Sequence, residues 1–377
     1  MSDALVTTET LTPRPLPEVE GAPSFVVASQ WRLMWWRFRR HRLALVGGVV
    51  IFGLYFVAVF SEFLAPYDPE ATSAQYTLAP PQVVHIYAWG AYVFGYKSVV
   101  DQQALRRTFT VDETTGINVQ LFARGAGYKL FGLIPLNVHL IGPEDPSAPM
   151  YLLGSDRLGR DMLSRVIYGT RVSMSIGLVG VALSLVLGVL LGGVSGFYGG
   201  LIDTAIQRVI EFLRSIPTIP LWLGLAAALP STWSPIQVYF AITVILSLIG
   251  WTGLARVVRG RFLSLREEDF VMAARLDGSS QLRIILRHMV PSFLSHIIAS
   301  ITLAIPAVIL SETSLSFLGL GLRPPVISWG VLLQEAQNIR SVATAPWLLA
   351  PGVTVVLAVL GLNFLGDGLR DAADPYG

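Results

Sequence analysis

The chain contains no cysteine and little charge, and both absences restrict what it can be. Without cysteine it can form no disulfide, thiol nucleophile, thiolate metal site or iron–sulfur cluster. Charged residues make up 14% of its 377 residues, whereas an average soluble domain carries about 25%. Hydrophobic residues make up 53%, and the mean hydropathy is +0.59. The net charge of only +2 gives the chain no overall positive field that would attract nucleic acid. The composition predicts a protein that crosses the membrane several times.

The motifs of common catalytic and nucleotide-binding sites are also missing. A Walker A loop needs Gly-Lys followed by Ser or Thr, but the two lysines, Lys97 and Lys129, both follow tyrosine. His288 and His296 are two helical turns apart, too far for a helical zinc site, and no Gly-x-Ser-x-Gly elbow occurs. We therefore expect a non-catalytic chain that holds no metal or cofactor of its own.

Long runs without a charged residue predict six membrane-spanning helices. The first run, Leu43–Ser61, would form a helix about 29 Å long, enough to cross the hydrocarbon core. The run Ser215–Ala255 has room for two helices and is broken by Leu229–Pro235. The six predicted spans are residues 43–64, 172–196, 206–229, 236–255, 292–318 and 346–367.

The distribution of arginine predicts the orientation of these spans. Arginines are concentrated in residues 29–42 and in the loop 256–291, and such segments stay in the cytoplasm. We therefore predict that both termini are cytoplasmic and that residues 65–165 face outward. Residues 1–28, rich in proline, are expected to be a disordered tail. The segment 29–42 is either a basic helix in the headgroup layer or a simple orientation anchor.

The cytoplasmic loop 256–291 has the pattern of two short helices joined by a turn. The first helix would run through Ala273 and Ala274 and end at Gly278, which can adopt a left-handed cap. The second would cover residues 279–289, before Pro291. The small alanine side chains would let a partner protein approach closely. An amphipathic loop lying on the bilayer is the alternative interpretation.

Four segments, in matching order, resemble signatures of the permease subunits of ABC importers in the dipeptide and oligopeptide family. The loop around Ala273 resembles the family's Ala-Ala-Arg-x-x-Gly coupling loop. The other segments are Gly154–Asp161, the stretch from Glu312 to Gly330, and Asn363–Pro375. The resemblance covers about residues 30–77 and 150–377, and it identifies the chain as a C-type permease subunit with an extended extracytoplasmic loop.

The resemblance implies an all-α polytopic protein with the six-helix fold of type I ABC importer permeases and a core permease domain over residues 166–377. It implies a non-catalytic subunit that forms half of the pathway of an ATP-driven, binding-protein-dependent peptide importer. The implied location is the inner (cytoplasmic) membrane of a bacterial cell. The implied partners are a second homologous permease, two ATP-binding subunits that hold ATP and Mg, an extracytoplasmic substrate-binding protein and the lipid bilayer.

Two groups of residues are assigned roles by this resemblance. Contact with the ATPase subunits, at residues 270–290, is assigned to Ala273, Ala274, Arg275, Asp277 and Gly278. Two positions there depart from the family pattern, because Met272 replaces a glutamate and Asp277 a leucine. Candidates for the outer mouth of the pathway are Asp156, Arg160, Asp161 and Glu312. Glu312, a carboxylate predicted at membrane depth, is either a substrate contact or a structural hydrogen-bond anchor.

Residues 78–150 form an insertion that the shortest members of the family lack. Its aromatic content argues against disorder, and Phe109–Gly116 has the pattern of a strand followed by a turn. We expect a small, mostly-β domain with one or two hairpins. It would serve as a platform for the binding protein or as a lid packed on the partner permease.

Other functions remain open from the sequence alone. The same machinery could carry oligosaccharides or other small solutes instead of peptides. Six spans would also suffice for a passive channel or a secondary transporter. Neither of these needs the cytoplasmic elbow, however, and secondary transporters usually contain inverted repeats and more intramembrane ionisable groups.

Overall fold

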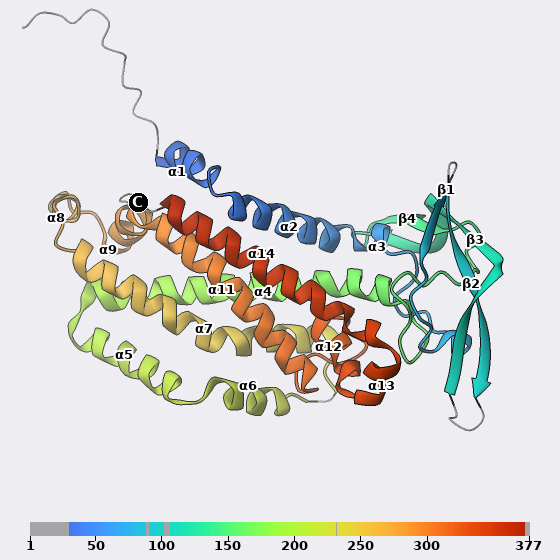
Figure 1. The fold of residues 1–377 in the computed structure, drawn as a ribbon. Helices are drawn as coiled ribbons and strands as arrows, with labels where there is room; N and C mark the ends of the chain where they lie inside the picture. Colours follow the sequence, from blue (N-terminus) through green and yellow to red (C-terminus); the bar gives the residue numbers. More distant parts are fainter. Residues whose placement is uncertain (1–29, 88–89, 102–105, 231, 374–377) are drawn as a thin grey trace, which may run out of the picture.

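The computed structural model describes residues 30–87, 90–101, 106–230 and 232–373, in a long helical bundle with a small sheet at one end (Figure 1). The predicted tail 1–28 and the terminal Asp374-Pro375 lie outside the described residues. The sheet and the connection between α8 and α9 lie at opposite ends of the bundle. The outward and cytoplasmic regions that the sequence predicts are thus separated by the full length of the helices.

Five described helices are long and apolar enough to cross a membrane. Their bounds are α2 (Arg42–Val59), α4 (Met162–Tyr198), α7 (Pro235–Leu265), α11 (Leu294–Phe317) and α14 (Ala350–Ala373), the last preceded by η4 (Pro346–Leu349). The shorter elements of the bundle are α1 (Gln30–Phe38), α3 (Ser61–Leu64), η1 (Ala74–Tyr76), α8 (Asp269–Leu276), α9 (Gln281–Arg283), η2 (Ile284–Met289), α10 (Val290–Ser292), α12 (Trp329–Gln334), η3 (Glu335–Gln337) and α13 (Ile339–Thr344).

The span predicted at 206–229 is not one helix. It is divided into α5 (Gly200–Ser215) and α6 (Thr218–Ala227), which are bent by 84° relative to each other. Pro217 stands in the break, has no backbone N–H to donate and cannot continue the hydrogen-bond ladder of α5. The predicted number of six spans therefore holds only if this bent pair crosses the membrane as one unit.

Close approach of α4 and α7 depends on glycine. A Cβ atom added to Gly192 would lie 2.4 Å from the backbone oxygen of Ala255, and one added to Gly196 would lie 2.6 Å from Cβ of Phe262. No larger residue fits without moving the helices apart. Small residues at such contacts allow membrane helices to pack backbone against backbone.

The insertion folds as a four-stranded antiparallel sheet. Its strands β1 (Val84–Tyr87), β2 (Gly90–Asp101), β3 (Arg106–Leu130) and β4 (Ile134–Pro143) are paired in chain order. The prediction of a small, mostly-β domain is confirmed, but there are three strand pairings, where one or two hairpins were expected. The long β2–β3 and β3–β4 ladders account for most of the sheet.

The turn predicted after Phe109 is a bulge inside β3. Pairing passes from Phe94–Gly116 to Gly95–Asp112, which leaves residues 113–115 without partners on β2. The Asp112 carboxylate accepts hydrogen bonds from the Thr114 N–H at 3.0 Å and the Thr115 hydroxyl at 3.0 Å. The residue types are therefore those of a turn, but strand pairing continues on both sides of it.

Candidate functional site

The elbow predicted within the loop 256–291 covers residues 269–289 and begins with the short helix α8. Gly278 has a φ of +71°, the left-handed conformation that the sequence predicts at this position. The Ser279 N–H donates to the Ala274 carbonyl at 3.1 Å, and the Gly278 N–H donates to the Arg275 carbonyl at 3.0 Å. These bonds satisfy carbonyl groups at the helix end and fix the direction in which the chain leaves it.

The second half of the elbow differs from the α-helix predicted at 279–289. It consists of α9 followed by η2, which is a π-helix. The Val290 N–H bonds the carbonyl of Ile285, five residues back. Pro291 has no N–H to donate, and its ring would crowd the carbonyl four residues before it in a regular α-helix. A wider turn relieves that contact.

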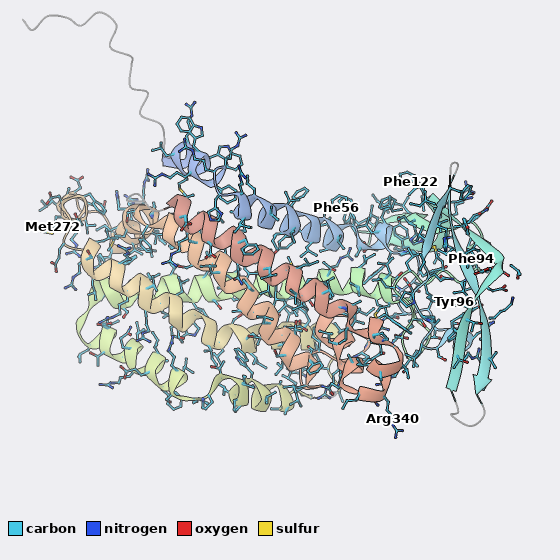
Figure 2. The ribbon with its side chains drawn as sticks, viewed as in Figure 1. Phe56, Phe94, Tyr96, Phe122, Met272 and Arg340 are labelled. Carbon is cyan, nitrogen blue, oxygen red and sulfur yellow. The ribbon has the colours of Figure 1, made fainter. Side chains whose placement is uncertain are left out.

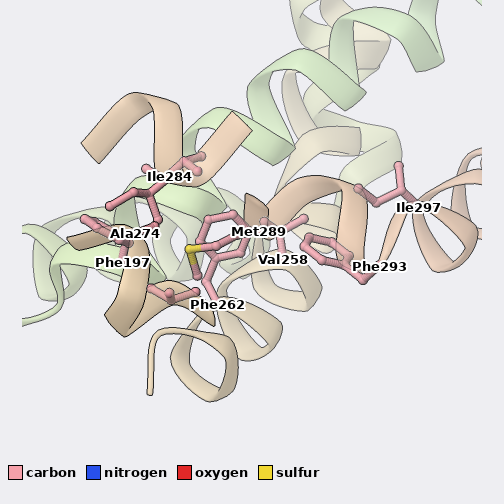
Figure 3. Packing of buried hydrophobic residues seen from close by; sticks show 10 residues of the cluster. Phe197, Val258, Phe262, Ala274, Ile284, Met289, Phe293 and Ile297 are labelled. Carbon is pink, nitrogen blue, oxygen red and sulfur yellow. The ribbon is translucent and has the colours of Figure 1, made fainter. Parts of the chain in front are cut away.

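One side of the elbow packs on the chain's own core. Val271 and Ala274 are buried in a cluster with Phe197 of α4, Phe262 of α7 and Met289 of η2 (Figure 3). The Arg275 guanidinium lies over the Phe197 ring, 4.9 Å from its centroid. This corrects the prediction that both alanines face a partner, because the i, i+3 spacing of Val271 and Ala274 places Ala274 inward.

The opposite side of α8 is free in this chain. On that side Ala273 is exposed, and Asp277 and Gly278 are exposed just after the helix. Arg275 is also exposed, although its guanidinium lies over Phe197 on the packed side. Met272 and Leu276, which lie one turn apart, are 50% and 88% exposed. The sequence analysis did not include Leu276 in the site, although an apolar residue at the end of a short helix in a predicted cytoplasmic loop was a signal for it.

The mouth candidates Asp156 and Arg160 lie together in the loop before α4. Asp156 is completely buried, and its Oδ1 accepts from the Leu158 N–H at 2.8 Å and the Arg160 N–H at 3.0 Å. Its Oδ2 accepts from Arg160 Nε at 2.6 Å and lies 3.1 Å from Arg165 Nη1. Arg160 also reaches Glu335 Oε1 at 3.3 Å. Burial, and after it the charge of Asp156, raises the pKa of Glu335.

Arg165 and Glu335 were not among the predicted site residues. The sequence does not indicate their partners, because Glu335 and Arg160, which form a hydrogen bond, are 175 residues apart in the chain. Trp347 adds another long-range contact, because its Nε1–H donates to the Ser155 carbonyl at 2.8 Å. The loop before α4 is therefore held against the segment between α12 and α14.

Asp161 begins α4 instead of lining an opening. Its Oδ2 accepts from the Ser164 N–H at 2.7 Å and from the Ser164 hydroxyl at 2.6 Å, which caps the helix. The Ser164 hydroxyl accepts in turn from the Tyr67 N–H at 3.0 Å. Burial raises the pKa of Asp161 to about 6. A cavity of about 410 Å³ between sheet and bundle is lined by other residues, among them Tyr128 and Arg171.

Glu312 lies in α11 and is completely buried. Its Oε1 accepts hydrogen bonds from the hydroxyls of Ser316 and Ser328, both at 2.8 Å, and its Oε2 from that of Ser173 at 3.4 Å. Ser328 caps α12, and Ser173 of α4 accepts from the Trp329 N–H at 3.1 Å. The carboxylate therefore joins α4, α11 and α12, and no oxygen faces open space.

A further ion pair lies at the end of the bundle that carries the elbow. Asp203 at the start of α5 accepts from Arg259 of α7 at 2.5 Å and 2.6 Å through its two oxygens. The Ser195 hydroxyl of α4 also donates to Asp203. Three helix ends next to the elbow are thus joined by one carboxylate, which sequence reasoning had not singled out.

Two family profiles match the chain. Residues 184–376 match the "Binding-protein-dependent transport system inner membrane component", and residues 29–81 match the "N-terminal TM domain of oligopeptide transport permease C". Between them lies the segment that contains the sheet.

Similar curated proteins include two from bacilli and one from Haemophilus influenzae. The dipeptide transport system permease protein DppC of Alkalihalophilus pseudofirmus is 38% identical over 62% of this chain and 74% of its own length. The oligopeptide transport system permease proteins OppC of Bacillus subtilis and H. influenzae are 34% and 39% identical, over 63% and 60% of this chain and 75% and 70% of theirs. Among solved structures, the MetNI methionine ABC transporter in an inward-facing conformation aligns with a TM-score of 0.44 and 18% identity, over 56% of this chain and 98% of that chain.

Proposed function

The chain belongs to the family of inner membrane components of binding-protein-dependent transport systems, and from this we propose how it works in an importer. It forms half of a peptide translocation pathway, and partner ATPases dock on the elbow and drive it. The proposal of a peptide substrate is supported by relatives named as dipeptide and oligopeptide permeases. The same helices would serve an oligosaccharide or another small solute equally well.

The observation that carries the proposal is the two-sided construction of α8. Its inner side is fixed by Val271 and Ala274, while Met272 and Leu276 present apolar side chains outward. Two large apolar side chains side by side on one short helix form a patch that a partner can bury. A docked helix with anchors one turn apart is a common way in which one protein fits a groove of another. A passive channel or a secondary transporter would need no such surface.

Force applied to α8 reaches several transmembrane helices at once. Its buried residues contact Phe197 of α4, Val258 and Phe262 of α7 and, through η2, Phe293 and Ile297 at the start of α11. Protein interiors are closely packed, so they transmit displacement and do not absorb it. Nucleotide-driven movement of the ATPases would therefore move the inner ends of α4, α7 and α11 together.

The predicted mouth residues then have supporting roles. Asp156 and Arg160 brace the loop before α4 against Glu335, Asp161 caps α4, and Glu312 fastens α12 to the bundle. All four act as positioning residues for the outer end of the pathway. The substrate itself would be bound by groups that this bracing holds in place.

The remaining partners follow from the family and from the topology. A second homologous permease completes the pathway, two ATPases bind ATP and Mg, and an extracytoplasmic binding protein delivers substrate, with the sheet as its platform. The chain would lie in the bacterial inner membrane with both termini in the cytoplasm. This orientation places α8 on the side where ATP is available.

The elbow is tested by placing a charge on its exposed side. Leu276→Glu should abolish co-purification of the cognate ATPases and ATP-driven uptake in proteoliposomes, because a carboxylate would have to be buried at the contact. Ile339→Glu is the matched control, since Ile339 is 85% exposed on α13 at the other end of the bundle. Normal ATPase binding and uptake by Leu276→Glu would refute the assignment of the elbow.

A further inference from the structure

The end of the β3–β4 hairpin carries apolar side chains that the described residues leave uncovered. The strands pair as far as Leu130–Ile134, and Phe131 and Gly132 form the turn with φ values of +55° and +72°. Leu133, next to the turn, is 81% exposed. A tight turn of this kind favours asparagine, aspartate or glycine, and a bulky aromatic residue rarely adopts such a backbone conformation. The hairpin therefore has an apolar tip where a polar one would fold more easily.

This tip lies beside the outer end of the first membrane span. The Phe131 ring centroid is 5.8 Å from that of Phe60, the residue that ends α2, and that of Phe122 is 6.2 Å from that of Phe63 in α3. An 18-residue helix such as α2 rises about 27 Å, close to the thickness of the hydrocarbon core. Phe60 therefore lies near the outer boundary of the hydrocarbon.

The exposed side of α2 leads directly to the hairpin. Val49, Phe52, Phe56 and Val59 form an exposed apolar stripe along this helix. Such a stripe on a membrane-spanning helix faces lipid where no other protein covers it. Phe56 and Phe122 lie along the same edge of the molecule (Figure 2). Together with the contact between Phe131 and Phe60, this places the apolar side chains from Phe122 to the tip in continuation of the surface that α2 presents to the bilayer.

We propose that the tip of the β3–β4 hairpin is inserted into the outer leaflet of the membrane. Phe131 and Leu133 would occupy the boundary between headgroups and acyl chains, where aromatic and aliphatic side chains are stable. Lys129, exposed and two residues before Phe131, would bring its ammonium group to lipid phosphates. The partner of this surface is the lipid itself. The sheet is then held at a fixed height above the membrane by the hairpin tip as well as by α3.

The absence of cysteine makes a direct test simple. Leu133→Cys and, in a second variant, Phe131→Cys would each carry a nitroxide spin label in the full transporter in nanodiscs of phosphatidylcholine and phosphatidylglycerol. Val99→Cys on β2 is the matched control, since Val99 is 64% exposed and pairs with Thr108 on the other hairpin. Collision rates of the label with oxygen, which enters lipid, and with a water-soluble nickel chelate report its environment.

The proposal expects a ratio of oxygen to nickel collisions at Leu133 and Phe131 at least about threefold higher than at Val99, since only these labels would reach apolar lipid. A ratio at both sites equal to that at Val99 would place the tip in water and overturn the proposal. Protection of both labels from oxygen and nickel alike would also overturn it, because the tip would then be covered by protein, such as the second permease.

Discussion

Replacement of Glu312 separates the two interpretations of this carboxylate. In Glu312→Ala the hydroxyls of Ser173, Ser316 and Ser328 lose their acceptor inside the bundle. Each buried polar group left without a partner costs about 1–3 kcal/mol, and part of this is offset because a buried charge is removed. We expect a loss of about 3–5 kcal/mol in the free energy of unfolding.

Glu312→Gln is the matched variant. Its amide oxygen can still accept hydrogen bonds from Ser316 and Ser328, so the expected loss is about 1 kcal/mol. Denaturation of the purified transporter in detergent would measure stability, and uptake into proteoliposomes would measure KM. If Glu312 is a structural anchor, Glu312→Gln should leave the KM for uptake unchanged. If Glu312→Ala were as stable as the unmodified chain while KM rose in both variants, Glu312 would be a substrate contact and the reasoning would be wrong.

Two further predictions concern pH and orientation. Because burial raises the pKa of Asp161 from 3.8 to about 6, the folded chain binds this proton more tightly than the unfolded chain. Its contribution to stability should be greatest below about pH 4 and should fall by about 3 kcal/mol as the pH rises to about 6. Asp161→Asn should remove this slope from pH-dependent denaturation, and an unchanged slope would assign it to another group. For orientation, a cysteine at exposed Ser264 should resist an impermeant reagent outside intact protoplasts, while one at exposed Glu113 should react; the reverse result would invert the topology.

The sequence predicted best those features that depend on a single residue type or a local pattern. Gly278 could be assigned a left-handed cap because few other residues adopt that backbone conformation, and the structure confirms it. The β character of the insertion followed from its aromatic residues and turn signals. The turn at Asp112 was misjudged because a bulge and a hairpin use the same side-chain hydrogen bonds.

Features that depend on contacts between residues far apart in the sequence could not be predicted from the sequence. Hydropathy measures composition, so it treated residues 206–229 as one span although Pro217 breaks the helix. The pairing of Asp203 with Arg259 joins residues 56 positions apart, and nothing local marks either one. The burial of Ala274 could have been predicted from the sequence, because Val271 lies three residues before it and both residues are apolar.

The length of α4 has a mechanical consequence. This one helix of 37 residues begins at its cap, Asp161, and reaches Phe197 under the elbow. At 1.5 Å per residue it is a rod about 55 Å long, so a tilt of about 5° shifts one end by about 5 Å relative to the other. Contact with α7 at Gly192 and Gly196 stiffens the inner part of that rod. A small rotation at the elbow end would therefore be converted, by leverage alone, into a displacement of the Asp156 loop at the other end of the bundle.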